Sequence, residues 1–358
     1  MTDSRIPVTL LTGFLGAGKT TLLNTLLTDA GTERIAIIVN EFGEAGLDHD
    51  LIETSSEEIV LMQSGCLCCS VRGDLSDTIA GLLDRLDNGL LDFGRIVIET
   101  TGLADPGPIL QTMTADPYLA RETRLDGVVT VVDAANGPAT LDAQFEAVSQ
   151  VAMADLIVIT KTDLVPEAKV AAFETRLRAI SPTAQILRAV RGAGTAARIR
   201  GLSGLRRGVA SAEALAWATG PTAAADPLAN LSGLDRPAAP QVDLSPHDAR
   251  IGTVSVVLDA PIPAHVFDYW LDTLIALRGP DILRLKGIAF IEDIDDPFVF
   301  HGVQHLFDPP VRLEDWSGDD RRSRIVIIAR DMTRPELQRS LDMLRAGLPD
   351  RRAGVASP

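Results

Sequence analysis

The sequence predicts an α/β fold: a doubly wound, mainly parallel domain followed by a smaller α+β domain. Three observations lead to this prediction. Apolar runs typical of buried strands alternate with helical patterns over residues 1–200. Residues 201–247 are rich in Ala, Gly, Pro and Arg, and regular patterns resume over 248–348. Because 358 residues are many for one hydrophobic core, we expect two domains joined by a flexible linker.

A glycine-rich loop lies between the first predicted strand and helix. Val8 to Thr12 is apolar, Thr20 to Thr28 carries leucines at helical spacing, and GFLGAGKT runs from Gly13 to Thr20. This G-x-x-x-x-G-K-[ST] pattern is typical of a phosphate-binding loop, in which Lys19 reaches the terminal phosphates and Thr20 binds Mg²⁺. A triphosphate is therefore the expected ligand. We expect its contacts to come from Gly13, Gly16, Ala17, Gly18, Lys19, Thr20 and Thr21.

Two further apolar runs end in polar residues. Ile35 to Asn40 is followed by Glu41, and Arg95 to Glu99 by the stretch TTGLADP. Carboxyl ends of parallel strands meet at one sheet edge, where ligands of such sheets bind. There, Glu99 can hold Mg²⁺ directly or through water, and the Gly102 amide can contact a γ-phosphate. Asp105 is the candidate for orienting the water in a hydrolysis reaction.

The rest of the first domain continues the alternation. We predict strands over 59–62, 127–133, 156–160 and 185–190, and helices over 73–86, 141–152 and 167–180. In the second domain we predict strands over 251–258, 282–291, 299–305 and 324–330, and helices over 265–277 and after residue 334.

The strand ending at Thr160 leads into Lys161-Thr162-Asp163. This stretch is similar to the N-K-x-D element with which GTPases recognise the base, with Thr160 in place of the usual Asn. Asp163 can accept hydrogen bonds from guanine N1–H and its exocyclic amine, a pair of donors that adenine lacks. The Lys161 side chain can lie over the base. The sequence therefore favours GTP over ATP.

All three cysteines of the chain fall within four residues, at Cys66, Cys68 and Cys69. Thiolates at this spacing suit Zn²⁺ or Co²⁺ in a tetrahedral site. A fourth ligand would be water, a group from a partner, or Glu41, which gives a site that can exchange its metal. Redox use is the main alternative because Cys66 and Cys69 have C-x-x-C spacing, and buried packing is another. The third thiol favours metal binding.

Composition excludes several classes of protein. The formal net charge is −16 with no extended run of Lys or Arg, so we expect no nucleic-acid partner. The N-terminal residues do not resemble a cleavable signal, and no apolar run is long enough to span a membrane. We therefore expect a cytoplasmic protein with no membrane partner and no structural disulfides.

The motifs together resemble the CobW-type metal-handling GTPases, relatives of UreG and HypB. The resemblance rests on GFLGAGKTT, NEFGE, GCLCCS, ETTGLADP and TKTD in this order. It continues in LRLKG at residues 283–287, HGVQH at 301–305, Trp316 and SRIV at 323–326, which are similar to the CobW C-terminal domain.

The resemblance implies a slow GTPase that binds a transition metal and releases it to a client metalloprotein on hydrolysis. Lys19, Thr20 and Glu99 would then serve phosphate and Mg²⁺, and Asp163 the guanine base. The metal would be held by Cys66, Cys68 and Cys69. The linker lacks the histidine-rich tract of many relatives, which favours Zn²⁺ over cobalt delivery for cobalamin synthesis.

Three other functions stay open at this point: a GTP-driven activator of a metalloenzyme such as a nitrile hydratase, a zinc-responsive regulator, and an ATP-using kinase or transferase. The oligomeric state is also open, since some relatives form homodimers on binding GTP. For the metal handler, we expect the cysteine loop to emerge at the carboxyl sheet edge, where a γ-phosphate can control metal affinity.

Overall fold

The chain divides into two compact units, Met1–Ser203 with Asn230–Asp248 and Gly204–Ala229 with Ala249–Pro358. The computed structural model describes residues 4–28, 34–40, 59–61, 67–71, 75–199, 202, 211–220, 245–304, 306–307, 310–314, 316 and 320–346. Within these ranges, no helix combines the length and apolar character needed to cross a bilayer.

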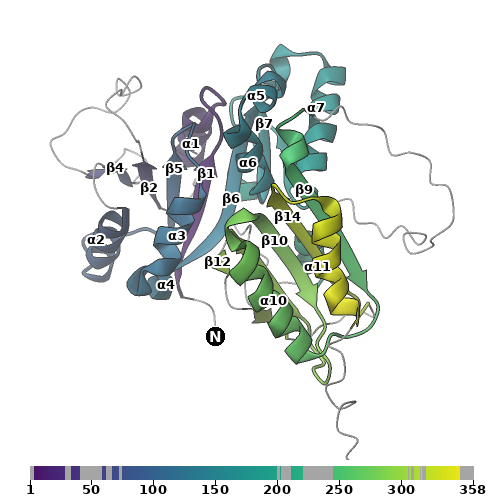
Figure 1. Cartoon of the computed structure of the whole chain (residues 1–358). Helices are drawn as coiled ribbons and strands as arrows, with labels where there is room; N and C mark the ends of the chain where they lie inside the picture. Colours follow the sequence, from purple (N-terminus) through teal and green to yellow (C-terminus); the bar gives the residue numbers. More distant parts are fainter. Residues whose placement is uncertain are drawn as a thin grey trace, which may run out of the picture. The chain divides into compact units, whose positions relative to one another are not determined.

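The first unit is built on an eight-stranded sheet of order β3-β4-β2-β5-β1-β6-β7-β8 (Figure 1). Neighbouring strands are parallel except β3 and β4, which are antiparallel. This confirms the predicted doubly wound α/β domain. The strands are β1 (Ile6–Thr12), β2 (Ile35–Asn40), β3 (Ile59–Leu61), β4 (Leu67–Val71), β5 (Arg95–Thr100), β6 (Thr123–Asp133), β7 (Leu156–Thr160) and β8 (Gln185–Arg188).

Helices connect these strands and bury their apolar faces on the sheet. One core joins helix residues such as Leu22, Leu26 and Ile199 with strand residues such as Val131 and Val158. Aliphatic residues dominate this core, as the low aromatic content requires. The helices are α1 (Lys19–Thr28), α2 (Leu75–Asp87), α3 (Gly107–Ala115), α4 (Pro117–Glu122), α5 (Gly137–Ala143), α6 (Phe145–Ala152), α7 (Glu167–Ile180) and α8 (Ala196–Ile199).

The second unit is an antiparallel sheet of order β12-β11-β10-β14-β9, with β13 paired to β11. Helices α10 and α11 cover one face through an apolar core that includes Trp270 and Leu341, and Figure 1 shows these two helices side by side. The predicted α+β domain is confirmed. Its elements are α9 (Ser211–Thr219), β9 (Ile251–Leu258), α10 (Ala264–Arg278), β10 (Ile282–Ala289), β11 (Phe298–Val303), β12 (Leu306–Phe307), β13 (Val311–Arg312), β14 (Ser323–Arg330) and α11 (Arg334–Ala346).

Helix α9 falls inside the segment that we expected to be a flexible linker. Its Ala214, Trp217 and Ala218 pack with Ile288 and Phe290 in a separate apolar core of the second unit. Burial of a tryptophan and two alanines supplies the apolar contact that holds this short helix on the sheet.

The single helix predicted near 141–152 is wrong, because two helices occupy this region. Gln144 ends α5 and precedes α6 with an extended backbone, φ −133° and ψ 113°. Hydrophobic spacing alone did not reveal the interruption, since both helices bury residues from the same apolar pattern, including Leu141 and Val148.

The prediction that the cysteines lie in a loop at the carboxyl edge is also wrong for Cys68 and Cys69. Their backbones belong to β4, where Cys68 pairs with Ile37 of β2 and Val60 of β3. The short sequence LCCSV supplies a strand that covers the otherwise open edge of β2.

A buried ion pair joins the central strands. Arg95 Nη1 lies 2.6 Å from Asp126 Oδ2, and both side chains are buried. The Arg124 guanidinium contacts the other oxygen of Asp126 at 3.2 Å. Removing one partner of a buried pair leaves a charge in a medium that solvates it poorly, so the loss should be large.

We expect Asp126→Ala to destabilise the first unit by about 3 kcal/mol, because it removes the carboxylate that both arginines contact. Urea unfolding followed by far-UV circular dichroism measures this. The second unit contains all three tryptophans, Trp217, Trp270 and Trp316. The urea midpoint of the tryptophan fluorescence transition should therefore stay unchanged. Glu122→Ala, which removes an exposed partner of Arg121, is the matched control. Equal stability of the Asp126→Ala and Glu122→Ala proteins would contradict the prediction.

Candidate functional site

The glycine-rich loop connects β1 to α1 at the carboxyl edge of the sheet. Gly13 has φ +139°, and a Cβ atom there would lie 2.3 Å from the Val131 carbonyl oxygen. Only glycine fits this position, because the backbone conformation and the close approach to β6 both exclude a side chain. Gly13, Gly16, Ala17 and Gly18 therefore occupy the predicted loop, which leads directly into α1 at Lys19.

Lys19 is buried at the beginning of α1. Its Nζ donates hydrogen bonds to the carbonyl oxygens of Gly13 at 2.8 Å and Phe14 at 3.4 Å. Burial lowers the pKa of Lys19, and the negative charge of Glu99 partly offsets this effect. The ammonium group is thus held inside the loop, where an anion can replace its carbonyl contacts.

Thr20 and Glu99 lie together beside this lysine. Thr20 Oγ1 is 3.5 Å from Glu99 Oε1, although 79 residues separate them along the chain. Glu99 is buried on β5 and pairs in register with Leu11 of β1. The predicted grouping of Lys19, Thr20 and Glu99 is therefore present, with Thr21 next to them in the first turn of α1.

The loop that follows β5 touches the glycine-rich loop. A Cβ atom at Gly102 would lie 2.5 Å from the Leu15 backbone nitrogen, so the two backbones are in direct contact at a position that requires glycine. Asp105 is exposed, and its Oδ1 accepts a hydrogen bond from the Gly107 amide at 2.9 Å. The Asp105 carboxylate thus has a structural contact at the start of α3.

Lys161 connects the end of β6 to the glycine-rich loop. Its Nζ donates to Asp133 Oδ2 at 2.6 Å and to the Gly16 carbonyl at 2.8 Å. Burial alone would raise the pKa of Asp133, but hydrogen bonds from Lys161 and from the Ala135 and Asn136 amides outweigh burial and lower it. The carboxylate therefore stays charged and fixes Lys161.

Thr160, which replaces the expected Asn, has a defined contact. Its buried hydroxyl lies 2.7 Å from the Ala17 carbonyl oxygen and can donate to it, which joins the end of β7 to the glycine-rich loop. Asp163 follows in a short 3₁₀ turn (Thr162–Leu164) with its side chain exposed. The exposed carboxylate is accessible to a ligand at this edge.

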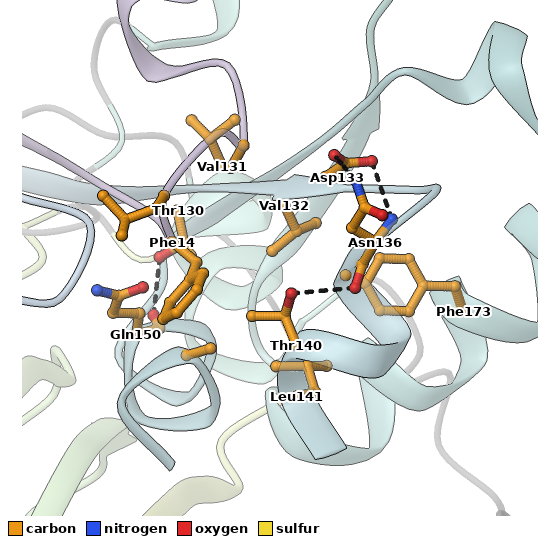
Figure 2. A pocket seen from close by; sticks show the side chains of 14 residues that line it. Phe14, Thr130, Val131, Val132, Asp133, Asn136, Thr140, Leu141, Gln150 and Phe173 are labelled. Carbon is orange, nitrogen blue, oxygen red and sulfur yellow. Dashed lines mark hydrogen bonds between the residues drawn. The ribbon is translucent and has the colours of Figure 1, made fainter. Parts of the chain in front are cut away.

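A pocket lies next to the glycine-rich loop (Figure 2). In Figure 2, Phe14 and Gln150 lie at one end of the pocket and Asp133 and Asn136 at the other. It is lined by Phe14, Leu15, Ala17, Thr130, Val131, Val132, Asp133, Asn136, Gly137, Thr140, Leu141, Ala147, Gln150 and Phe173.

Part of the predicted metal site cannot be compared with the structure, because Glu41 and Cys66 lie outside the described residues. The backbones of Cys68 and Cys69 lie in β4, and the register continues from Cys69 through Ile38 of β2 to Ile98 of β5. Within the described ranges, His, Cys, Asp and Glu residues form no group of three suited to a metal ion.

The arrangement is suited to binding a phosphorylated ligand. It combines a glycine-rich loop, a buried lysine, a helix N-terminus and a carboxylate next to a hydroxyl at one sheet edge. Residues 7–188 match the family described as "CobW/HypB/UreG, nucleotide-binding domain", and residues 251–345 match "Cobalamin synthesis protein cobW C-terminal domain". The chain belongs to the CobW family.

Curated relatives of this CobW protein extend the match over nearly the whole chain. It is 34% identical to the zinc chaperone YjiA of Escherichia coli K12 over 95% of this chain and 99% of the relative. It is 32% identical to the zinc-regulated GTPase metalloprotein activator 1 of Schizosaccharomyces pombe over 92% of this chain and 83% of the relative.

A solved structure confirms the fold. The Zn(II)-bound YjiA GTPase from E. coli matches with a TM-score of 0.71 and 30% identity. The match covers 96% of this chain and 100% of the YjiA chain. A Zn(II)-bound YjiA variant with one glutamate and two adjacent cysteines replaced by alanine matches with a TM-score of 0.72 and 32% identity, covering 96% and 99% of the two chains.

Sequence reasoning missed Asp133 and Gln150 of this CobW protein. Asp133 closes an apolar strand just as Glu99 does, so the same signal was available. Gln150 had no such signal, because a glutamine within an amphipathic helical pattern resembles any polar residue. Its burial and its contacts are visible only in the folded chain.

We expect Gly102→Ala to lower nucleotide affinity about tenfold or more. Its Cβ would meet the Leu15 backbone, and overpacking of this kind costs about 1–3 kcal/mol when the backbone must move. Titration calorimetry with GDP measures the change. The control is Gly81→Ala in α2, where nothing lies within 4 Å of the added atom, and where alanine should be neutral or stabilising by up to about 1 kcal/mol. Unchanged GDP affinity in Gly102→Ala would show that the contact between Gly102 and the Leu15 backbone is not needed for nucleotide binding.

Proposed function

We propose that this protein is a GTP-dependent zinc chaperone, which binds Zn²⁺ through Cys66, Cys68 and Cys69 and transfers it to a client metalloprotein after hydrolysing GTP. The observation that carries the proposal is the strand register: β2 lies between β4, which contains Cys68 and Cys69, and β5, which contains Glu99. The cysteine strand is thus two strands, or about 10 Å, from the strand that leads into the nucleotide site.

The nucleotide site has the parts that GTP hydrolysis needs. Lys19 exchanges its carbonyl contacts for phosphate oxygens, and the Gly102 amide contacts the γ-phosphate. Thr20 and Glu99 fit Mg²⁺, which prefers oxygen ligands and would neutralise charge on the β- and γ-phosphates. Water attacks the γ-phosphorus and GDP and phosphate leave, with Asp105 as our candidate for orienting that water. No covalent intermediate on the protein is required.

The base would lie at Lys161 and Asp163. The Asp133 and Gly16 contacts hold the Lys161 ammonium, so that its aliphatic stem can cover the base. The exposed Asp163 carboxylate accepts from guanine N1–H and the exocyclic amine, which is the contact that selects GTP over ATP.

Zinc is the cargo in this proposal. Three thiolates suit Zn²⁺, and Glu41, which follows β2 in sequence, is the proposed fourth ligand. The relatives named zinc chaperone support zinc as the metal, and the Zn(II)-bound YjiA variant has one glutamate and two adjacent cysteines replaced by alanine. The name of the S. pombe relative, a metalloprotein activator, supports a metalloprotein as the client.

We also propose that the protein acts in the cytoplasm and forms a GTP-dependent homodimer.

The test of the proposal is the linkage between the two sites. We expect Mg²⁺–GTP, supplied as a non-hydrolysable analogue, to raise the affinity for Zn²⁺ about fivefold or more relative to GDP. By reciprocity, saturating Zn²⁺ must raise the ratio of analogue affinity to GDP affinity by the same factor. Competition with a chromogenic zinc chelator measures the first affinity and calorimetry the second. Equal nucleotide affinity with and without Zn²⁺ would remove the coupling.

We expect Cys68→Ser to weaken Zn²⁺ binding by about tenfold or more, since even loss of an outer contact to a metal ligand has an effect of this size. Ser70→Ala in the same strand is the control and should bind Zn²⁺ normally. GDP affinity should be unchanged in both variants. A Cys68→Ser protein with normal Zn²⁺ affinity would show that the metal site lies elsewhere.

We expect Asp163→Asn to lower GTP affinity about tenfold or more and to create affinity for xanthosine triphosphate. An amide can donate to the C2 carbonyl of xanthine, whereas the wild-type carboxylate repels it. Competition against a fluorescent guanine nucleotide measures both effects, with ATP as the second competitor. Displacement of the probe from the wild-type protein by ATP as readily as by GTP would support the kinase or transferase alternative instead.

A further inference from the structure

We propose that Gln150 is a positioning residue for GTP hydrolysis, which fixes the loop after β5 so that the Gly102 amide faces the γ-phosphate. The inference rests on the proposed GTPase function and adds a residue outside the sequence motifs. Gln150 lies on α6 and only 1% of its surface is exposed.

The Gln150 side chain holds the loop by two hydrogen bonds. Its Nε2 donates to the Ala104 carbonyl at 3.0 Å and to the Gly102 carbonyl at 3.4 Å. Two carbonyl acceptors on the same side identify that atom as the amide nitrogen rather than the oxygen. The loop backbone on both sides of Leu103 is thus fixed to α6 by one side chain.

The α6 backbone is held in turn by the sheet. The Gln150 carbonyl accepts a hydrogen bond from Thr130 Oγ1 at 2.7 Å, and Thr130 lies on β6 next to β1. Gly102 contacts Leu15 of the glycine-rich loop from the other side. Gln150 therefore completes a continuous path from the central sheet to the Gly102 peptide and the glycine-rich loop.

The side-chain oxygen of Gln150, Oε1, reduces what this residue contributes to stability. Gln150 Oε1 is buried, and no described residue donates a hydrogen bond to it. A buried acceptor without a partner costs free energy, which offsets part of what the two Nε2 bonds contribute. If Gln150 served stability alone, a side chain that leaves no buried oxygen without a donor would serve better.

The proposal predicts that activity and stability respond differently to substitution. Gln150→Met keeps the length and volume of the side chain but removes both donors. We expect a modest fall in melting temperature, because two loop carbonyls lose their donor while the buried Oε1 is also removed. We expect kcat for GTP to be about tenfold lower, because the Gly102 amide is no longer fixed toward the γ-phosphate. Affinity for a non-hydrolysable GTP analogue should fall several-fold more than affinity for GDP, which has no γ-phosphate.

Two further variants make the test specific. Gln150→Glu places a carboxylate against the Gly102 and Ala104 carbonyls and should lower kcat at least as much as Gln150→Met. Ser149 is also buried on α6, and its side chain donates no hydrogen bond to the loop within the described residues. Ser149→Ala should therefore leave kcat and both affinities unchanged. Amide hydrogen exchange of residues 100–106, measured without nucleotide, should be faster in Gln150→Met than in Ser149→Ala.

The results separate this inference from the proposed function. Wild-type protein that binds no GTP would refute the proposed function itself. Wild-type GTPase activity together with an unchanged kcat and an unchanged ratio of analogue to GDP affinity in folded Gln150→Met would refute the role of Gln150. Should Gln150→Met unfold, unchanged exchange of residues 100–106 in folded Gln150→Glu would refute it as well.

Discussion

The candidate site depends on the direct contact of backbone segments at positions where no side chain fits. Gly13 meets the Val131 carbonyl and Gly102 meets the Leu15 amide nitrogen. Each contact brings a loop against a neighbouring strand or loop at the carboxyl edge of the sheet. The backbone amides of these loops are the groups that bind phosphate, so side chains at these two positions would displace the binding groups themselves.

Polar side chains then hold these loops in place. Thr160 contacts Ala17, Lys161 contacts Gly16, and Gln150 contacts Ala104, and each of these partners is a backbone carbonyl. Because the C=O and N–H groups of one peptide unit point in opposite directions, each held carbonyl also fixes the direction of the amide that follows it. An anion would therefore meet an already oriented set of donors, and little reorganisation free energy would be lost on binding.

Much of the first unit could be predicted from the sequence because its signals are local. The strand over Leu156–Thr160 and the helix over Glu167–Ile180 have the predicted bounds, since continuous apolar runs and helical spacing each point to one structure. The grouping of Lys19, Thr20 and Glu99 followed from motif spacing and the topology of parallel sheets. The break at Gln144 and the strand that contains Cys68 could not be predicted, because they depend on packing and on pairing with the edge of β2. The contacts of Gln150 likewise join residues that are 46 positions apart.

The placement of β4 limits how GTP could control zinc in the proposed function. Cys68 and Cys69 are paired on one side with β2 and on the other with β3. A strand paired on both sides cannot slide by one residue without exchanging the faces of all its side chains, so its register is fixed. The two cysteine backbones would therefore act as a fixed part of the metal site.

The change driven by the γ-phosphate must then act on metal ligands outside the paired strands. The proposed set contains two such ligands: Cys66, which precedes β4, and Glu41, which follows β2. Of these two, Glu41 is the more direct connection, since β2 pairs with β5 up to Thr100, immediately before the loop that carries Gly102.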